Sequence, residues 1–160
     1  ARERPDAKTN CIVVGFDTQL TFNKIENACR VIESGAEYIA THPDLMCPLD
    51  GVNVPDCGAL CEMLYMATGR RPKVIGKPEP LMAQMAMEKA GIGVEESVFI
   101  GDRLNTDIAC GINGGVDTCV LFTGEAQKKD ILTPEGEPNT QYLPDYAFEN
   151  VQELLDACKE

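Results

Sequence analysis

The sequence has little positive charge, no long apolar run and a single histidine. Its 160 residues carry 14 lysines and arginines against 26 aspartates and glutamates, a formal net charge of -12. No cluster of basic side chains occurs, so we expect no binding to a nucleic acid polymer, which needs such clusters. No apolar stretch approaches the ~20 residues that cross a bilayer, so we expect no membrane partner. The first ten residues, ARERPDAKTN, lack the apolar segment of a secretory signal, which favours a cytoplasmic protein.

Cysteine is abundant, but its spacing does not indicate a disulfide framework. The 8 cysteines lie mostly inside apolar periodic segments, and none forms a Cys-x-x-Cys pair. We interpret them as small buried hydrophobic residues. A metal site built from Cys47, Cys57, Cys61 and His42 is the less favoured alternative, because zinc ligands are usually paired more closely along the chain.

Apolar runs alternate with helical patterns along the chain, which indicates an α/β protein with a parallel sheet covered by helices. Strands are expected at 11–16, 37–41, 73–76, 97–101 and 118–122, with a weaker one near 145–148. Helices are expected at 23–34, 56–68, 80–90, 105–114 and 149–158.

Three local features refine this prediction. Asn23 and Glu26 have the spacing of a capping box at the start of the first helix. In the third helix, Met82, Met85 and Ala86 form an apolar stripe that we expect to face the core. The segment GRRPK at 69–73 separates two α/β portions, and the proline-rich stretch at 132–144 is expected to be a surface loop.

Two carboxylates follow the strand expected at 97–101. In the segment IGDRLNTD, the strand ends at Gly101, Asp102 comes next, and Asp107 falls in the first turn of the following helix. The carboxyl ends of parallel strands face the crevice in which α/β proteins bind ligands. Carboxylate pairs suit Mg²⁺, which prefers oxygen ligands and is commonly held by one or two carboxylates plus a substrate phosphate. For Asp107 alone, stabilisation of a helix N-terminus would be the preferred explanation.

A lysine follows a second strand end. In VIGKPEP, the strand ends at Gly76 and Lys77 comes next, before Pro78. An isolated Lys-Pro would be an ordinary solvated loop, but a lysine beside an acidic site can stabilise a phosphoryl group and its nucleophile. The sequence therefore predicts that Lys77, Asp102 and Asp107 act on a phosphate.

These two motifs together resemble the haloacid dehalogenase (HAD) superfamily of phosphatases. The segments VVGFD with Lys24, YIATHPD, PDCGAL and TGRRP are similar to its subfamily IIA, the branch of NagD, 4-nitrophenylphosphatases and phosphoglycolate phosphatases. The resemblance covers nearly the whole chain. It implies a partial three-layer HAD-like Rossmannoid core with part of a large α/β cap: 1–70 as the second half of the cap and 71–160 as the carboxyl-terminal half of the core.

The resemblance also implies a mechanism. One aspartate attacks phosphorus to give an aspartyl-phosphate, and another, two residues later, protonates the leaving group and then activates water. By position, Asp102 inherits the role of a Mg²⁺ ligand, Asp107 a supporting role at the metal, and Lys77 the contact to the phosphate and the nucleophile. The expected substrates are small phosphorylated metabolites: phosphoglycolate, nucleoside monophosphates or sugar phosphates, with 4-nitrophenyl phosphate as an artificial ester. Pairing into a homodimer through the cap is also expected.

The sequence contains no clear candidate for the nucleophilic aspartate. Asp17, with Thr41 as a phosphate-binding hydroxyl, would make a compact phosphatase. However, Gln19 cannot transfer a proton, and Leu20 stands where the turn needs a small residue. The resemblance also places both segments in the cap. We therefore expect the Asp-x-Asp segment upstream of Ala1, and no phosphatase activity from these 160 residues alone.

The cap of this family supplies substrate selectivity, and Thr41, His42 and Asp44 are the candidates for substrate contacts. His42 could bind a substrate group near neutral pH. A turn in which Asp44 bonds its own backbone explains the loop equally well. A second class of function also remains open, a non-catalytic phosphate-binding module that retains Lys77 and Asp102. A receiver-like protein is disfavoured, because its acidic pair should precede its acceptor aspartate.

Overall fold

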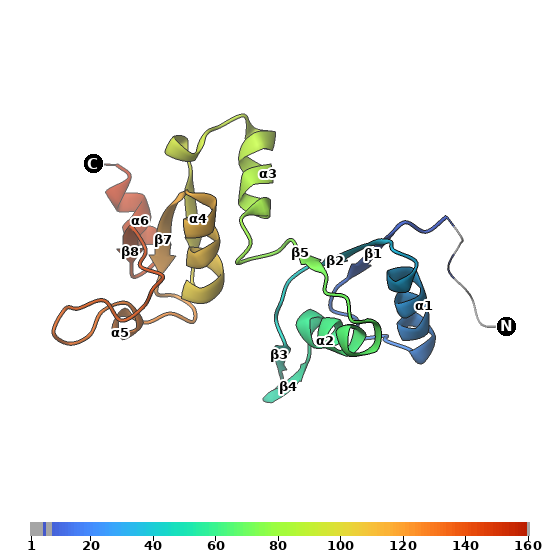
Figure 1. Ribbon diagram of the computed structural model, residues 1–160. Helices are drawn as coiled ribbons and strands as arrows, with labels where there is room; N and C mark the ends of the chain where they lie inside the picture. The colour runs from blue at the N-terminus through green and yellow to red at the C-terminus, as the bar shows by residue number, and fades with distance from the viewer. Residues whose placement is uncertain (1–4, 6–7, 160) are drawn as a thin grey trace. The chain divides into compact units, whose positions relative to one another are not determined.

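In the computed structural model the chain forms two compact units, Ala1–Gly76 and Lys77–Glu160, each built around its own parallel sheet (Figure 1). The structure describes residue 5 and residues 8–159. This α/β architecture with parallel sheets confirms the predicted fold class. The division falls after Gly76 rather than near residue 70, because the strand at 73 pairs with the sheet of the first unit. The assignment of 1–70 and 71–160 to halves of a cap and a core stays a prediction.

The first unit has a three-stranded parallel sheet in the order β1-β2-β5. Its strands are β1 (Cys11–Val14), β2 (Glu37–Ala40) and β5 (Lys73–Val74). Helices α1 (Phe22–Glu33) and α2 (Cys57–Thr68) pack against each other, and α2 also packs against β1 and β2. The core between them consists of Ile32, Tyr38, Ala40, Cys57, Cys61 and Leu64.

Both helices of this unit begin with a side-chain cap. The N-cap of α1 is Thr21, whose hydroxyl oxygen accepts a hydrogen bond from the Lys24 N–H at 3.3 Å. The expected capping box of Asn23 and Glu26 is wrong, because the helix has already begun at Phe22. The N-cap of α2 is Asp56, whose carboxylate accepts from the Cys57 N–H at 2.6 Å. Such caps satisfy backbone donors that have no partner inside the helix.

A β-hairpin between β2 and α2 was not expected. Strands β3 (Met46–Leu49) and β4 (Val52–Pro55) are antiparallel, and they are joined by Asp50 and Gly51. Both turn residues have positive φ, 48° and 82°. This is the two-residue turn that an Asp-Gly sequence favours. Most residues of both strands are exposed, so no alternating apolar pattern marked them.

The second unit has a three-stranded parallel sheet in the order β6-β7-β8. Its strands are β6 (Val98–Gly101), β7 (Asp117–Leu121) and β8 (Tyr146–Phe148). The helical elements are α3 (Leu81–Ala90), the 3₁₀ turn η1 (Val94–Glu96), the π-helical turn η2 (Leu104–Ile108), α4 (Ala109–Gly114), α5 (Lys128–Ile131) and α6 (Val151–Ala157). Helix α4 packs against β6 and β7, and α6 packs against β8 (Figure 1). One core cluster contains Ile108, Val120, Ala126 and Ile131.

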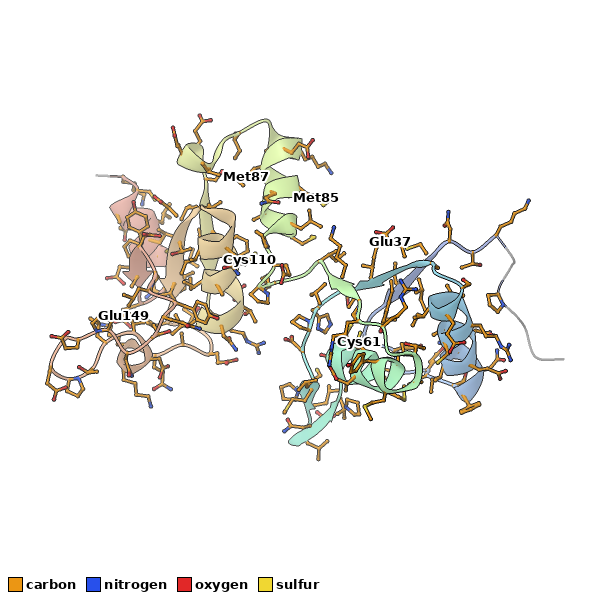
Figure 2. The ribbon with its side chains drawn as sticks, in the orientation of Figure 1. Glu37, Cys61, Met85, Met87, Cys110 and Glu149 are labelled. Atoms are coloured by element: carbon orange, nitrogen blue, oxygen red, sulfur yellow. The ribbon has the colours of Figure 1, made fainter. Side chains whose placement is uncertain are left out.

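The apolar stripe expected on α3 is wrong. Met82 and Met85 are about half exposed (Met85 is labelled on α3 in Figure 2). Ala86 is exposed as well, and the residue that α3 buries is Ala83. Helix α3 packs on α4, where the small residues Ala83 and Gly114 approach each other. A close contact of two small residues, rather than the long methionine side chains, therefore holds this helix pair together.

All eight cysteines are free. Cys57, Cys61, Cys110 and Cys119 are buried, three others are half-buried, and Cys158 is exposed. Burial raises the pKa of the Cys61 thiol to about 11 and also raises the pKa of Cys110 and Cys119. The prediction of buried hydrophobic thiols is right for these four residues and wrong for Cys158. Within residues 8–159, no helix is both long enough and apolar enough to cross a membrane.

Candidate functional site

The structure brings Lys77 and Asp107 into direct contact. The Lys77 Nζ lies 2.5 Å from Asp107 Oδ1, and the pair joins residues that are 30 positions apart. The Asp107 side chain is only 7% exposed, whereas that of Lys77 is 47% exposed. One end of the pair is therefore buried in the protein, and the ammonium group remains accessible to a ligand.

Asp107 is held in place by the local backbone. Residues 104–108 form a π-helical turn rather than the α-helical start that was expected, and the Ile108 N–H donates to the Arg103 carbonyl oxygen. The Arg103 N–H donates to Asp107 Oδ2 at 3.2 Å. A Cβ at Gly101 would lie 2.8 Å from Asp107 Oδ2 and closer still to its Cγ, so only glycine fits there. Such π-helical turns are rare and often occur at functional sites.

Lys77 is anchored from α4. It forms a cis peptide bond with Pro78, whose carbonyl oxygen accepts from the Asn113 side-chain amide at 2.9 Å. The Cys110 thiol donates to the carbonyl oxygen of Glu79 at 3.2 Å (Figure 2). Two side chains of one helix therefore fix the loop that follows Lys77. The sequence patterns gave no sign of these two contacts, because they join loop and helix residues over more than 30 positions.

Asp102 lies at the end of β6 and is held by a different segment. Its Oδ2 accepts from the Glu125 N–H at 3.0 Å, and its main-chain oxygen accepts from the Ala126 N–H at 2.9 Å. Within residues 8–159, Asp102 Oδ1 has no hydrogen-bond partner, whereas both oxygens of Asp107 are engaged. A carboxylate oxygen at a strand end is a donor that hard cations such as Mg²⁺ prefer. The residues present therefore fit such a cation, with Asp102 as the better placed ligand.

The predicted substrate residues Thr41, His42 and Asp44 lie in the first unit, at the end of β2. The His42 Nδ1 lies 3.6 Å from Asp44 Oδ2, and its Nε2 lies 3.4 Å from Asp56 Oδ1. One ligand-type atom from each of His42, Asp44 and Asp56 falls within a 4.8 Å cluster. Asp56 was missed as a site residue, because as the N-cap of α2 it has an ordinary structural role.

The loop around His42 is fixed against the start of α2. The Gly58 N–H donates to the Asp44 carbonyl oxygen at 2.7 Å, and the Asp56 N–H donates to that of Leu45 at 3.1 Å. In the described structure the Asp44 side chain faces His42. A small pocket of about 150 Å³ adjoins this loop, with His42 and Arg71 among its lining residues.

Asp17 also lies in the first unit, close to the end of β1. Its Oδ2 contacts Lys24 Nζ at 2.7 Å, and its Oδ1 accepts from the Gln19 N–H at 2.8 Å. The hydrogen bond from Lys24, followed by that from Gln19, lowers the pKa of Asp17. Asp17 and Thr41 follow neighbouring strands of one sheet, whereas Asp102 and Asp107 follow a strand of the other. A compact phosphatase would carry all of these groups on the edge of a single sheet.

The HAD-hydrolase-like family model matches residues 74–154. An acid sugar phosphatase of Staphylococcus aureus is 33% identical over 150 residues, which make up 94% of this chain and 56% of that protein. The chain therefore belongs to the HAD superfamily of hydrolases.

Solved structures place the chain in the predicted branch. The 4-nitrophenylphosphatase of Thermotoga maritima is 38% identical, with a TM-score of 0.80 over 92% of this chain and 54% of that one. The p-nitrophenyl phosphatase of Archaeoglobus fulgidus is 28% identical, with a TM-score of 0.83 over 92% of this chain and 56% of that one. These are the NagD and 4-nitrophenylphosphatase type of HAD enzyme. The chain spans about half the length of the relatives it matches.

Proposed function

We propose that this chain is part of a phosphomonoester hydrolase that acts on small phosphate esters, and that its second unit supplies the cation site and the phosphate-side lysine. The observation that carries the proposal is the 2.5 Å contact of Lys77 with the buried Asp107, in the same unit as Asp102, which directly follows β6. The phosphatase names of relatives that match more than nine-tenths of the chain support the same reaction class. The specific ester, among sugar phosphates, nucleoside monophosphates and phosphoglycolate, is left open.

The residues of the second unit have distinct roles in this proposal. Asp102, with support from Asp107, would hold Mg²⁺, which screens the repulsion between an attacking carboxylate and the phosphate oxygens. Asp107 orients Lys77 through the 2.5 Å contact. The ammonium group of Lys77 has three N–H donors, so the donors that do not face Asp107 can bind phosphate oxygens. Lys77 therefore stabilises the negative charge that gathers on the phosphoryl group during transfer.

The nucleophile in this proposal is not Asp17. Asp17 and Asp102 follow strands of different sheets, whereas a compact phosphatase would carry both at one sheet edge. An amide at position 19 can neither donate a catalytic proton to a leaving group nor accept one from water. We infer that the aspartyl-phosphate forms on a carboxylate other than those of this chain, and that the isolated chain does not turn over phosphate esters.

Substrate selectivity in this proposal comes from the first unit. Thr41, His42 and Asp44 are the proposed substrate contacts, and Asp56 is added to them because it faces the other nitrogen of His42. The pocket lined in part by His42 supports this role, since it places open space directly beside the proposed contacts. Pairing of two chains through this unit remains a prediction.

Calorimetry with Mg²⁺ tests the cation site directly. The Asp102→Asn variant removes the charge of the proposed ligand, and we expect its Mg²⁺ affinity to fall at least ~10-fold. Asp117→Asn is the matched control, because it removes one carboxylate charge at the opposite end of the same sheet, where β7 begins. Equal losses in the two variants would show that only overall charge matters, and would contradict the proposed site.

Turnover of 4-nitrophenyl phosphate tests the nucleophile. We expect the 160-residue chain to show no hydrolysis in the presence of Mg²⁺. Hydrolysis that disappears in an Asp17→Asn variant, but persists in Asp117→Asn, would establish the compact phosphatase instead. Binding of the ester that weakens in Lys77→Met, without turnover, is the result that supports the proposed role of the second unit.

A further inference from the structure

The loop that follows β7 lies against the proposed metal ligand. Strands β6 and β7 are parallel neighbours, with Gly101 opposite Val120, so their carboxyl ends reach the same edge of the sheet. The chain leaves this edge through residues 123–126 before it enters α5. These four residues, Thr123 to Ala126, are called the β7 loop below.

The β7 loop makes two backbone hydrogen bonds to a single residue. The Glu125 N–H donates to Asp102 Oδ2 at 3.0 Å, and the Ala126 N–H donates to the main-chain oxygen of Asp102 at 2.9 Å. Together they fix both the position of the Asp102 backbone and the rotation of its carboxylate. Only one oxygen, Oδ1, is left without a partner among the described residues.

Gly124 makes this approach possible. A Cβ at this position would lie 2.8 Å from the Cβ of Asp102 and closer still to both Cγ and Oδ2. Real Cβ atoms do not approach other heavy atoms so closely, so a side chain at 124 would push either the loop or the carboxylate away. Gly124 does not have a positive φ, so backbone conformation does not explain the glycine. The lack of space beside the Asp102 carboxylate does.

The loop is anchored at its far end. Ala126 is 5% exposed and packs in the core cluster with Ile108 and Val120. An ion pair of 2.7 Å joins Arg103 Nε to Glu125 Oε2, but both side chains are substantially exposed, so it contributes little. The buried Ala126 and the absence of a side chain at Gly124 are the features that hold the Glu125 N–H against Asp102.

We propose that Gly124 and the backbone N–H of Glu125 position the Asp102 carboxylate, so that it binds the divalent cation through Oδ1 alone. These are positioning residues rather than catalytic ones, since they act through Asp102. The inference rests on the cation role proposed for Asp102. Groups that orient a metal ligand in this way are typically worth about 10-fold to 100-fold in metal affinity.

Mg²⁺ affinity of the full 160-residue chain, measured by calorimetry, tests this inference. Gly124→Ala places a methyl group against the carboxylate, and we expect its affinity to fall at least ~10-fold. Gly93→Ala is the matched control in the same unit, because a Cβ there meets nothing within 4 Å.

A second measurement does not depend on the folding of a variant at position 124. In the parent chain, the Glu125 amide resonance should move as Mg²⁺ binds, with the same midpoint as the calorimetric titration. In Asp102→Asn the same resonance should start from a different position and no longer respond to Mg²⁺. An amide that merely supported the fold would not follow the metal titration.

The outcomes separate the two proposals. If the parent chain binds Mg²⁺ and Asp102→Asn does not, while Gly124→Ala is folded and binds as the parent does, the inference is overturned and the cation role of Asp102 stands. A Glu125 resonance that ignores Mg²⁺ overturns it in the same way. If the parent chain does not bind Mg²⁺, the cation role fails and the inference fails with it.

Discussion

The pair of Lys77 and Asp107 gives the sharpest test of the site geometry. We consider a double-mutant cycle with Lys77→Met, Asp107→Asn and the double variant. Loss of the lysine leaves a carboxylate that is 7% exposed and that, among the described residues, keeps one partner, the Arg103 N–H. Loss of the aspartate leaves an ammonium group that is 47% exposed and can turn to water. The lysine variant should therefore be the more destabilised of the two single variants.

The expected coupling free energy lies between two limits. Exposed ion pairs contribute about 0–1 kcal/mol, and breaking a fully buried pair costs about 3–5 kcal/mol. Because one partner is buried and the other is half in water, we expect a coupling of about 1–2 kcal/mol. The double variant should then recover part of the stability that Lys77→Met loses, since it no longer contains a buried carboxylate without a counter-charge.

Hydrogen exchange of the β6 and β7 amides in increasing urea measures this coupling. It reports on the second unit alone, which matters because the two units need not unfold together. The matched control is the cycle of Lys128 and Glu149, an ion pair in the same unit whose side chains are 73% and 52% exposed. No measurable coupling is expected there. If the coupling of Lys77 and Asp107 is no larger than that of the control pair, their contact does not stabilise the site.

Three further predictions concern the first unit. Thr21→Ala should lower the free energy of unfolding of this unit by about 1 kcal/mol, because the cap of α1 is lost, whereas Asn23→Ala should lower it less. Urea unfolding of the two variants measures this difference. A larger loss in Asn23→Ala would mean that Asn23, rather than Thr21, caps the helix. Gly51→Ala should lower the free energy of unfolding by about 1 kcal/mol, because φ at this hairpin position is 82°, which is unfavourable for a residue with a side chain. An unchanged urea midpoint would argue against this turn. Burial raises the pKa of Cys61 to about 11, so the unfolded chain releases this proton first as pH rises above 9. The free energy of unfolding should then fall by about 1–3 kcal/mol between pH 9 and 11, and this fall should be smaller in Cys61→Ala; equal slopes in the two proteins would refute it.

The sequence by itself determined the order of most elements and the three central residues of the candidate site. Apolar runs ending in glycine located β6 and β7, and the rule that ligands bind at strand ends selected Asp102. Lys77 and Asp107 followed from the same reasoning, and the structure places them in contact. The strands and this contact could be anticipated because the period of apolar residues and the end of a strand can be read directly from the sequence, whereas the roles of the three residues stay predictions.

Some local signals were present but were overlooked or misassigned. The Asp50-Gly51 dipeptide is a hairpin signal in its own right, yet the strands beside it are too exposed to show alternation. The cap of α1 is Thr21 rather than the expected Asn23, because the helix begins at Phe22. Differences of one or two residues at helix ends are decided by packing as much as by sequence preference.

The tertiary structure alone decided the contacts that give the site its shape. The pairing of β5 with β2 placed the boundary of the units after Gly76, and the contact of Asp56 with His42 joins a helix cap to a loop. The hydrogen bond from the Glu125 N–H to Asp102 joins residues 23 positions apart. Its donor is a backbone N–H, which every residue except proline has. No pattern of side chains marks such a bond. It becomes visible only when the strand register brings the two loops to the same edge of the sheet and Gly124 leaves room for the carboxylate.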